Sequence, residues 1–165
     1  MSYVESLRQS FRPARITTLF IGESTPRTGT FFYEENSKLF YAMQKAFCGH
    51  EDFLEYFKSK GFYLDDLASE PINNLASKER AQLRRNSITS LSDRLKIYTP
   101  DAIVIVMRAI KPMVLKAMRE AGLSYDPYCT PFPTFGNQAR FHEAMTEIIP
   151  NLPFIKQLHK KGNKK

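Results

Sequence analysis

With 165 residues, 42% of them hydrophobic, the chain can bury one core but leaves little room for a second domain. Its 24 lysines and arginines exceed its 17 aspartates and glutamates, and the net charge of +7 favours an anionic partner such as nucleic acid, a nucleotide or a membrane surface. We therefore expect one domain over residues 1–155 and a basic tail, residues 156–165, that is a solvated end rather than a binding arm.

The two cysteines are far apart, and neither Cys48 nor Cys129 belongs to a CxxC pair, so cysteine cannot supply a zinc or iron–sulfur site. We expect free thiols, no metal cluster and no cofactor. The first fifteen residues lack the apolar segment of a signal peptide, and no stretch approaches the roughly 20 apolar residues of a membrane span. These features predict a soluble cytoplasmic protein without a membrane partner, and we expect a monomer.

Taken in chain order, apolar runs alternate with amphipathic segments. Residues 16–22, "ITTLFIG", are rich in β-branched side chains and end at a glycine, which is typical of a buried strand. Residues 36–47 and 51–61 carry apolar side chains three and four positions apart, which predicts two helices before a second strand over 62–67. Beyond it we predict a helix over 77–98, a strand over 101–107, a helix over 111–122, a strand over 126–131 and a helix over 137–150.

Strands separated by helices in this order predict an α/β fold: a three-layer α/β/α sandwich around a mostly parallel sheet of about four strands. Ligands of such sheets bind beyond the carboxyl ends of the strands. Three polar loops should meet there, namely "GESTPRTGTFFY" (22–33), "DDLASEPINN" (65–74) and "CTPFPTFGNQ" (129–138).

These loops carry a family resemblance. The segment "GESTP" followed by "GTFFYEENSKLF" resembles the first motif of the uracil-DNA glycosylase superfamily in its GEAPG form, and it puts Phe32 in the position that stacks on an extruded base. The segment "FYLDDLASEP" is similar to the family's second motif, with Asp66 at the base-reading asparagine. The segment "TPFPTFGNQARF" has the proline spacing of the third, with Thr130 at the histidine. The resemblance covers residues 16–145, although the chain lacks the iron–sulfur cysteines of GEAPG-type members.

The resemblance implies a DNA glycosylase-like hydrolase that binds an extruded base and acts on single-stranded or damaged DNA. In this interpretation Glu23 and Thr130 are catalytic, and the base contacts Gly22, Ser24, Phe32 and Asp66. Contacts to the nucleic acid would come from Arg27, Phe135, Asn137 and Arg140. Glu23 would position a water or offset the positive charge on the sugar, and Thr130 would offer the leaving base a neutral hydrogen bond.

Asp66 is the most informative departure from the family pattern. An ionised aspartate only accepts hydrogen bonds, so it favours guanine-like, hypoxanthine-like or cytosine-like edges over uracil, whereas a protonated one would imitate asparagine. Side chains alternate along a strand, so only one of Asp65 and Asp66 should face the site. Loss of the histidine predicts weak or altered activity.

Each of these residues also has a purely structural interpretation: Phe32 as core, Glu23 as a cap or ion pair, Asp66 as a cap, and Arg80, Arg84 and Arg85 as a solvated helix face. Two functional alternatives remain open. One is a non-catalytic nucleic-acid-binding module of the same fold. The other is an enzyme that acts on a free nucleoside or nucleotide.

Overall fold

The centre of the structure, a computed structural model that describes residues 1–27 and 29–156, is a sheet of four parallel strands. The strands are β1 (Thr18–Gly22), β2 (Phe62–Asp66), β3 (Ala102–Ile105) and β4 (Tyr128–Cys129), in the order β2-β1-β3-β4. Gly22, the last residue of β1, lies opposite Asp66, the last residue of β2. The predicted parallel α/β fold is confirmed, with the strand expected over 126–131 reduced to two residues.

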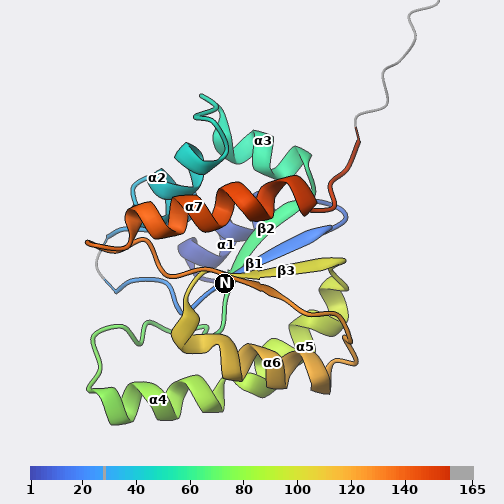
Figure 1. Cartoon of the computed structure of the whole chain (residues 1–165). Helices are drawn as coiled ribbons and strands as arrows, with labels where there is room; N and C mark the ends of the chain where they lie inside the picture. The colour runs from blue at the N-terminus through green and yellow to red at the C-terminus, as the bar shows by residue number, and fades with distance from the viewer. Residues whose placement is uncertain (28, 157–165) are drawn as a thin grey trace, which may run out of the picture.

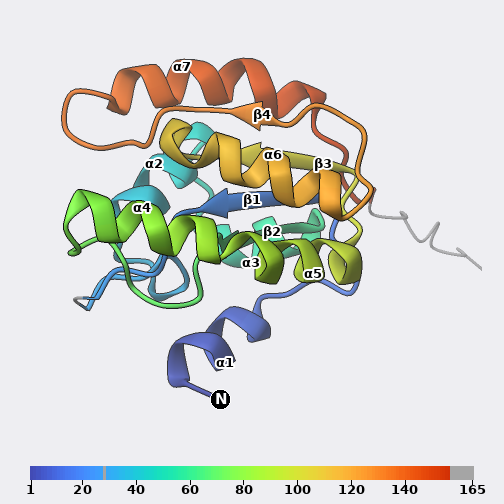
Figure 2. The ribbon, with the colours of Figure 1, turned by 90° about the horizontal axis from the view of Figure 1, so that it is seen from below.

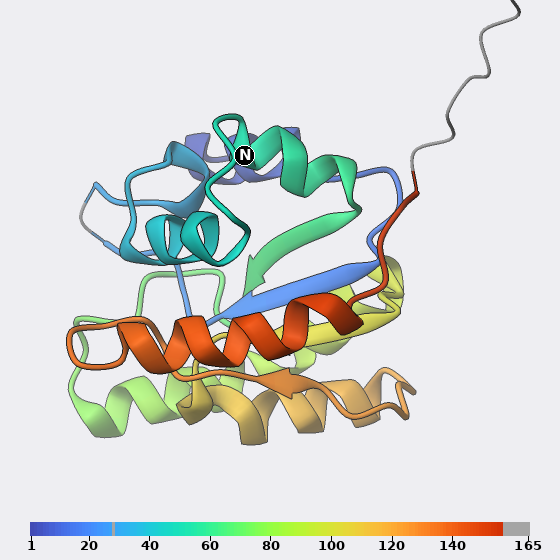
Figure 3. The same cartoon turned by 45° about the horizontal axis from the view of Figure 1, so that its top comes forward.

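Helices cover both faces of this sheet, which makes the predicted three-layer sandwich (Figure 1). One face carries α2 (Lys38–Ala46), α3 (Phe53–Ser59) and α7 (Gln138–Ile148), and the other carries α5 (Ile88–Tyr98) and α6 (Lys111–Glu120). Helix α4 (Ser77–Asn86) extends past the carboxyl ends of the strands, and α1 (Tyr3–Ser10) lies beyond the β2 edge (Figure 2). Figure 3 shows α1 on the same side as α3. Residues 157–165 of the expected tail lie outside the described residues.

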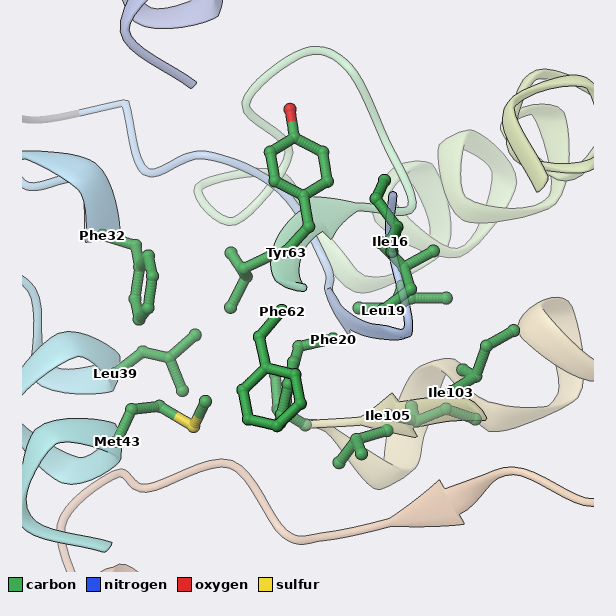
Figure 4. Close-up of a cluster of buried hydrophobic side chains, with 14 of the residues drawn as sticks. Ile16, Leu19, Phe20, Phe32, Leu39, Met43, Phe62, Tyr63, Ile103 and Ile105 are labelled. Carbon is green, nitrogen blue, oxygen red and sulfur yellow. The ribbon is translucent and has the colours of Figure 1, made fainter. Parts of the chain in front are cut away.

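The layer between the sheet and α2 and α3 is built mainly from aromatic rings. Phe20 of β1 contacts Phe57 of α3, with ring centroids 5.1 Å apart, and Phe62 of β2, at 5.8 Å. Phe32 lies at the margin of this cluster beside Leu39 and Met43 of α2 (Figure 4). Because the rings meet edge-on or tilted, which suits their quadrupoles, they fill the layer closely.

A tyrosine hydroxyl bonds to the backbone of β2 on the side where no further strand of the described residues pairs with it. The hydroxyl of Tyr33, in the 3-10 turn Phe32–Glu34, donates to the Leu64 carbonyl and accepts from the Leu64 amide, both at 2.8 Å. Arg8 of α1 also donates to this carbonyl, at 3.4 Å. Unpaired backbone at a sheet edge invites association with other chains, so these contacts close the edge and draw α1 and residues 32–34 toward the end of β2.

One expectation about the helices was wrong, and one helix was not foreseen. The helix predicted over 77–98 is two helices, α4 and α5, that meet at Ser87, whose hydroxyl donates to the Leu83 carbonyl at 2.7 Å. A hydroxyl that bonds back to a carbonyl four residues earlier competes with the helix's own amides and favours a break. Helix α1 was not predicted. It is capped by Ser2, whose hydroxyl accepts from the Glu5 amide at 3.2 Å, and its Val4 and Leu7 pack against the core beside the buried Arg8.

Candidate functional site

A pocket of about 530 Å³ opens at the carboxyl ends of β1 and β2. It is lined by residues of all three polar loops that were expected from the sequence to meet, among them Gly22, Glu23, Ser24, Phe32 and Asp66. These are five of the ten residues that the sequence assigned to a site. The pocket wall also includes Lys38, Asn73 and Arg80, which the sequence did not assign to the pocket. A parallel sheet brings successive strand ends to one edge, which explains why residues so far apart in sequence meet.

Gly22 and Asp66 form the floor of the pocket through an unusually close approach. A Cβ atom at position 22 would lie 2.6 Å from Oδ1 of Asp66, so only glycine leaves room for the carboxylate over the end of β1. Oδ2 of Asp66 accepts from Nη2 of Arg8 at 3.1 Å and from the Thr25 hydroxyl at 3.3 Å. Those contacts occupy one carboxylate oxygen, and the other lies against Gly22 beside the pocket.

Asp65 points away from the pocket, as the alternation of a strand requires. Oδ2 of Asp65 accepts from Arg94 and from the Tyr98 hydroxyl of α5, both at 2.8 Å, while Oδ1 lies 3.3 Å from Arg8. Arg8 therefore bridges the two neighbouring carboxylates. The Asp66 side chain therefore lies at the pocket, and the Asp65 side chain lies on the α5 side of the sheet.

The pKa values of the two carboxyl groups shift in opposite directions. Burial raises the pKa of Asp66 and outweighs the opposing effect of Arg8, with the charge on Asp65 adding to the rise. Burial also raises the pKa of Asp65, but Arg94 and Arg8 more than offset it and the net shift is downward. Burial lowers the pKa of Arg8, but the charges of Asp66 and Asp65 raise that pKa by more. The net shift is upward, so the guanidinium stays charged. Asp66 is thus the member of this cluster that takes up a proton most readily.

Glu23 is held between two guanidinium groups of α4. Its carboxylate accepts from Nε of Arg80 at 2.9 Å and is paired with Arg84 as well, and the residue is only 5% exposed. Of the three arginines expected on a solvated helix face, Arg80 and Arg84 instead fasten α4 to the end of β1, while Arg85 is exposed as expected. Both carboxylate oxygens of Glu23 are therefore engaged in charge-assisted hydrogen bonds.

Phe32 belongs to both the core and the pocket. It is 3% exposed, and its ring lies within 5.1–5.9 Å of the rings of Tyr33, Phe57 and Phe40. These contacts are edge-on or tilted, and the ring also lines the pocket. The two interpretations weighed for Phe32 are therefore compatible, since one ring can pack on the core and still border a ligand.

The other five predicted residues lie outside this pocket. Thr130 follows β4 and is fully buried: its amide donates to the Ile105 carbonyl at 2.8 Å, and its hydroxyl has no hydrogen-bond partner among the described residues. Pairing with β3 turns the side chain into the protein, and Thr130 does not line the pocket. Arg27, Phe135 and Arg140 are exposed, Phe135 at 93%, and Asn137 precedes α7, where its carbonyl accepts from the Phe141 amide.

Arg8 is the most consequential residue that the sequence did not reveal. It lies 58 positions before Asp66, and no motif marks it. Lys38 was visible within the first motif without an assigned role. Arg8 could be identified as the partner of Asp65 and Asp66 only once the fold had brought α1 next to the end of β2.

Among residues 1–27 and 29–156, no group of three or more histidine, cysteine, aspartate or glutamate side chains is placed to hold a metal ion. Within the same residues, no helix combines the length and apolar character needed to cross a membrane. Comparison of the chain with protein-family models and with curated proteins returned no match.

Proposed function

We propose that the pocket binds a nucleobase extruded from DNA, and that the protein is a DNA glycosylase-like hydrolase with an altered base preference. The observation that carries this proposal is the meeting of Gly22, Phe32 and Asp66 in one pocket. The resemblance to the uracil-DNA glycosylase superfamily assigns these residues to the base. A site that binds a flipped base needs an aromatic ring to stack on it and a polar group that bonds to its edge. It also needs backbone that lets the base approach closely.

The charge around the pocket supports a ligand that carries phosphate. Glu23 faces two arginines, which leaves one positive charge in excess, whereas Asp65 and Asp66 are balanced by Arg8 and Arg94. Lys38 adds a second positive charge to the pocket wall. Phosphate contacts supply much of the affinity of proteins for nucleic acids, so this excess suits a nucleotide within a strand.

Asp66 sets the expected base preference. Oδ1 of Asp66, which accepts no hydrogen bond from the described residues, would accept from ring and amino N–H groups, as hypoxanthine-like and guanine-like edges present them. Burial raises the pKa of Asp66, and the protonated form would also donate a hydrogen bond, as an asparagine does. We expect a preference for bases with donor edges that weakens as the pH falls and Asp66 takes up a proton.

A second candidate function is base binding without hydrolysis, and the surroundings of Glu23 favour it. Both of its oxygens accept from guanidinium groups, and Thr130 is buried away from the pocket. Positive charge beside the reacting sugar opposes an oxocarbenium-like transition state, and loss of one stabilising group typically costs about 3 kcal/mol in the barrier.

One experiment separates these functions. Oligonucleotides that carry uracil, hypoxanthine, xanthine or an oxidised base are incubated with the protein, and abasic sites are then cleaved with alkali. Hydrolysis predicts cleavage at a donor-edge base that is lost in Asp66→Ala and kept in Glu70→Ala, an exposed control in the same loop. Base-dependent binding without cleavage supports the second candidate. Binding of free nucleotides alone, with no effect of the base within an oligonucleotide, refutes both and favours an enzyme of free nucleotides.

A further inference from the structure

A second hollow, of about 660 Å³, lies between α2 and α7. We call it the α2–α7 groove. Its walls include Lys38, Tyr41 and Lys45 of α2, Gln138 and His142 of α7, and Pro133 of the preceding loop. Helices α2 and α7 pack against each other below it, so the groove is a surface feature of a fixed helix pair.

The groove adjoins the base pocket. Lys38 lines both hollows, and the loop before α7 borders both, with Thr134 on the pocket side and Pro133 on the groove side. A chain molecule with one unit in the pocket would therefore meet the groove next. Continuity of this kind favours a polymeric ligand over two unrelated small ones.

The side chains of the groove suit a nucleic acid strand. Residues 38, 41 and 45 are spaced by three and four and lie on one face of α2, about 10 Å from first to last along the helix axis. Tyr41 is 58% exposed between the two lysines, and neither Lys38 nor Lys45 forms an ion pair within residues 1–27 and 29–156. Glu143 is the acidic residue of the groove wall, so positive charge prevails.

We propose that the α2–α7 groove binds single-stranded nucleic acid, with the strand that leaves the base pocket running over Lys38, Tyr41 and Lys45. Lysines neutralise the phosphates and Tyr41 stacks on an unpaired base. The bases of a duplex are already stacked on one another, so an exposed ring beside lysines suits a single strand. The direction of the strand rests on the proposed function of the pocket, whereas binding in the groove does not.

Fluorescence anisotropy with labelled oligothymidylate, in single-stranded and duplex form, tests the proposal across a range of salt concentrations. Tyr41→Ala should lower the affinity for the single strand by roughly 5- to 100-fold without changing the salt dependence. Lys45→Glu should lower the affinity and reduce the slope of log affinity against log salt by about one. Lys116→Glu, an exposed change on α6, serves as the matched control and should alter the slope less. Circular dichroism checks that each variant is folded.

The outcomes distinguish the groove from the pocket. Oligothymidylate binding that depends on Tyr41 and Lys45 but not on Asp66 supports the groove even if the base-pocket proposal fails. Binding that Tyr41→Ala and Lys45→Glu leave unchanged overturns the groove proposal, whatever the pocket does. Tighter binding of duplex than of single strand also overturns it, as does equal binding of polyglutamate, which would identify an acidic polypeptide as the ligand class.

Discussion

Replacement of Arg8 by leucine should destabilise the protein strongly, because it leaves two buried carboxylates without their shared counterion. The side chain of Arg8 is 5% exposed, and those of Asp65 and Asp66 are 9% and 8% exposed. Removing one partner of a buried ion pair typically costs about 3–5 kcal/mol. Asp65 keeps Arg94 and Tyr98, so most of the loss should come from Asp66. Urea unfolding at neutral pH measures the change in the free energy of unfolding.

The loss should depend on pH in a defined direction. Burial raises the pKa of Asp66 in the folded parent, so its favourable contribution is present at low pH and is lost as the pH rises through that pKa. For Asp65, burial is outweighed by Arg94 and Arg8, its pKa is lowered, and its contribution is lost as the pH falls through that pKa. Without Arg8 both pKa values rise, so the deficit of Arg8→Leu should shrink as the pH falls from neutral into the acidic range.

Arg15→Leu is the matched control. Arg15 pairs with Asp101 at 2.8 Å, but the two side chains are 60% and 46% exposed, and surface pairs of this kind contribute about 1 kcal/mol or less. The double variant Arg8→Leu, Asp66→Asn should recover part of the loss, since it removes an unpaired charge. A cost for Arg8→Leu no larger than that of Arg15→Leu, at all pH values, would refute the argument from burial.

Three further changes probe the pocket. Gly22→Ala should cost about 1–3 kcal/mol and weaken base binding, because the new Cβ displaces the Asp66 carboxylate; unfolding and base-binding titrations check this. Glu23→Gln should speed amide exchange in α4 but not in α5, because α4 buries none of its own side chains and is fastened through Glu23; hydrogen exchange with mass spectrometry measures both helices. Phe32→Ala should cost about 3–5 kcal/mol as a core truncation, so Phe32→Leu is the better test of stacking. We expect Phe32→Leu to weaken base binding while salt-dependent binding of oligonucleotides persists, and equal loss of both would contradict a stacking role.

The fold was predictable because its signals are local. Runs such as residues 16–22 and 101–107 are apolar and β-branched, and they form strands wherever a sheet can bury both faces. The helices within residues 36–47 and 111–122 follow from the three- and four-residue spacing of apolar side chains. The turn after α3 is marked by Gly61, whose φ is +81°. All of these signals lie within a few residues of the chain. Parallel order then brings the strand ends together, so the location of the pocket followed from local reasoning. That reasoning required only one of Asp65 and Asp66 to face the pocket, and the choice of Asp66 came from the family resemblance.

The partners of the site residues could not be predicted, because they are fixed by contacts across long sequence separations. Glu23 meets Arg80 and Arg84 from positions 57 and 61 residues away, and Asp66 meets Arg8 from 58 residues away. Ion pairs have no sequence period, and which arginine reaches which carboxylate depends on how α1 and α4 pack on the sheet. Thr130 shows the same limit, since its pairing with β3 turns a plausible site residue into the core. Local propensities thus place the backbone and its strand ends, while burial and charge pairing, which arise only after the helices dock, assign each side chain its surroundings.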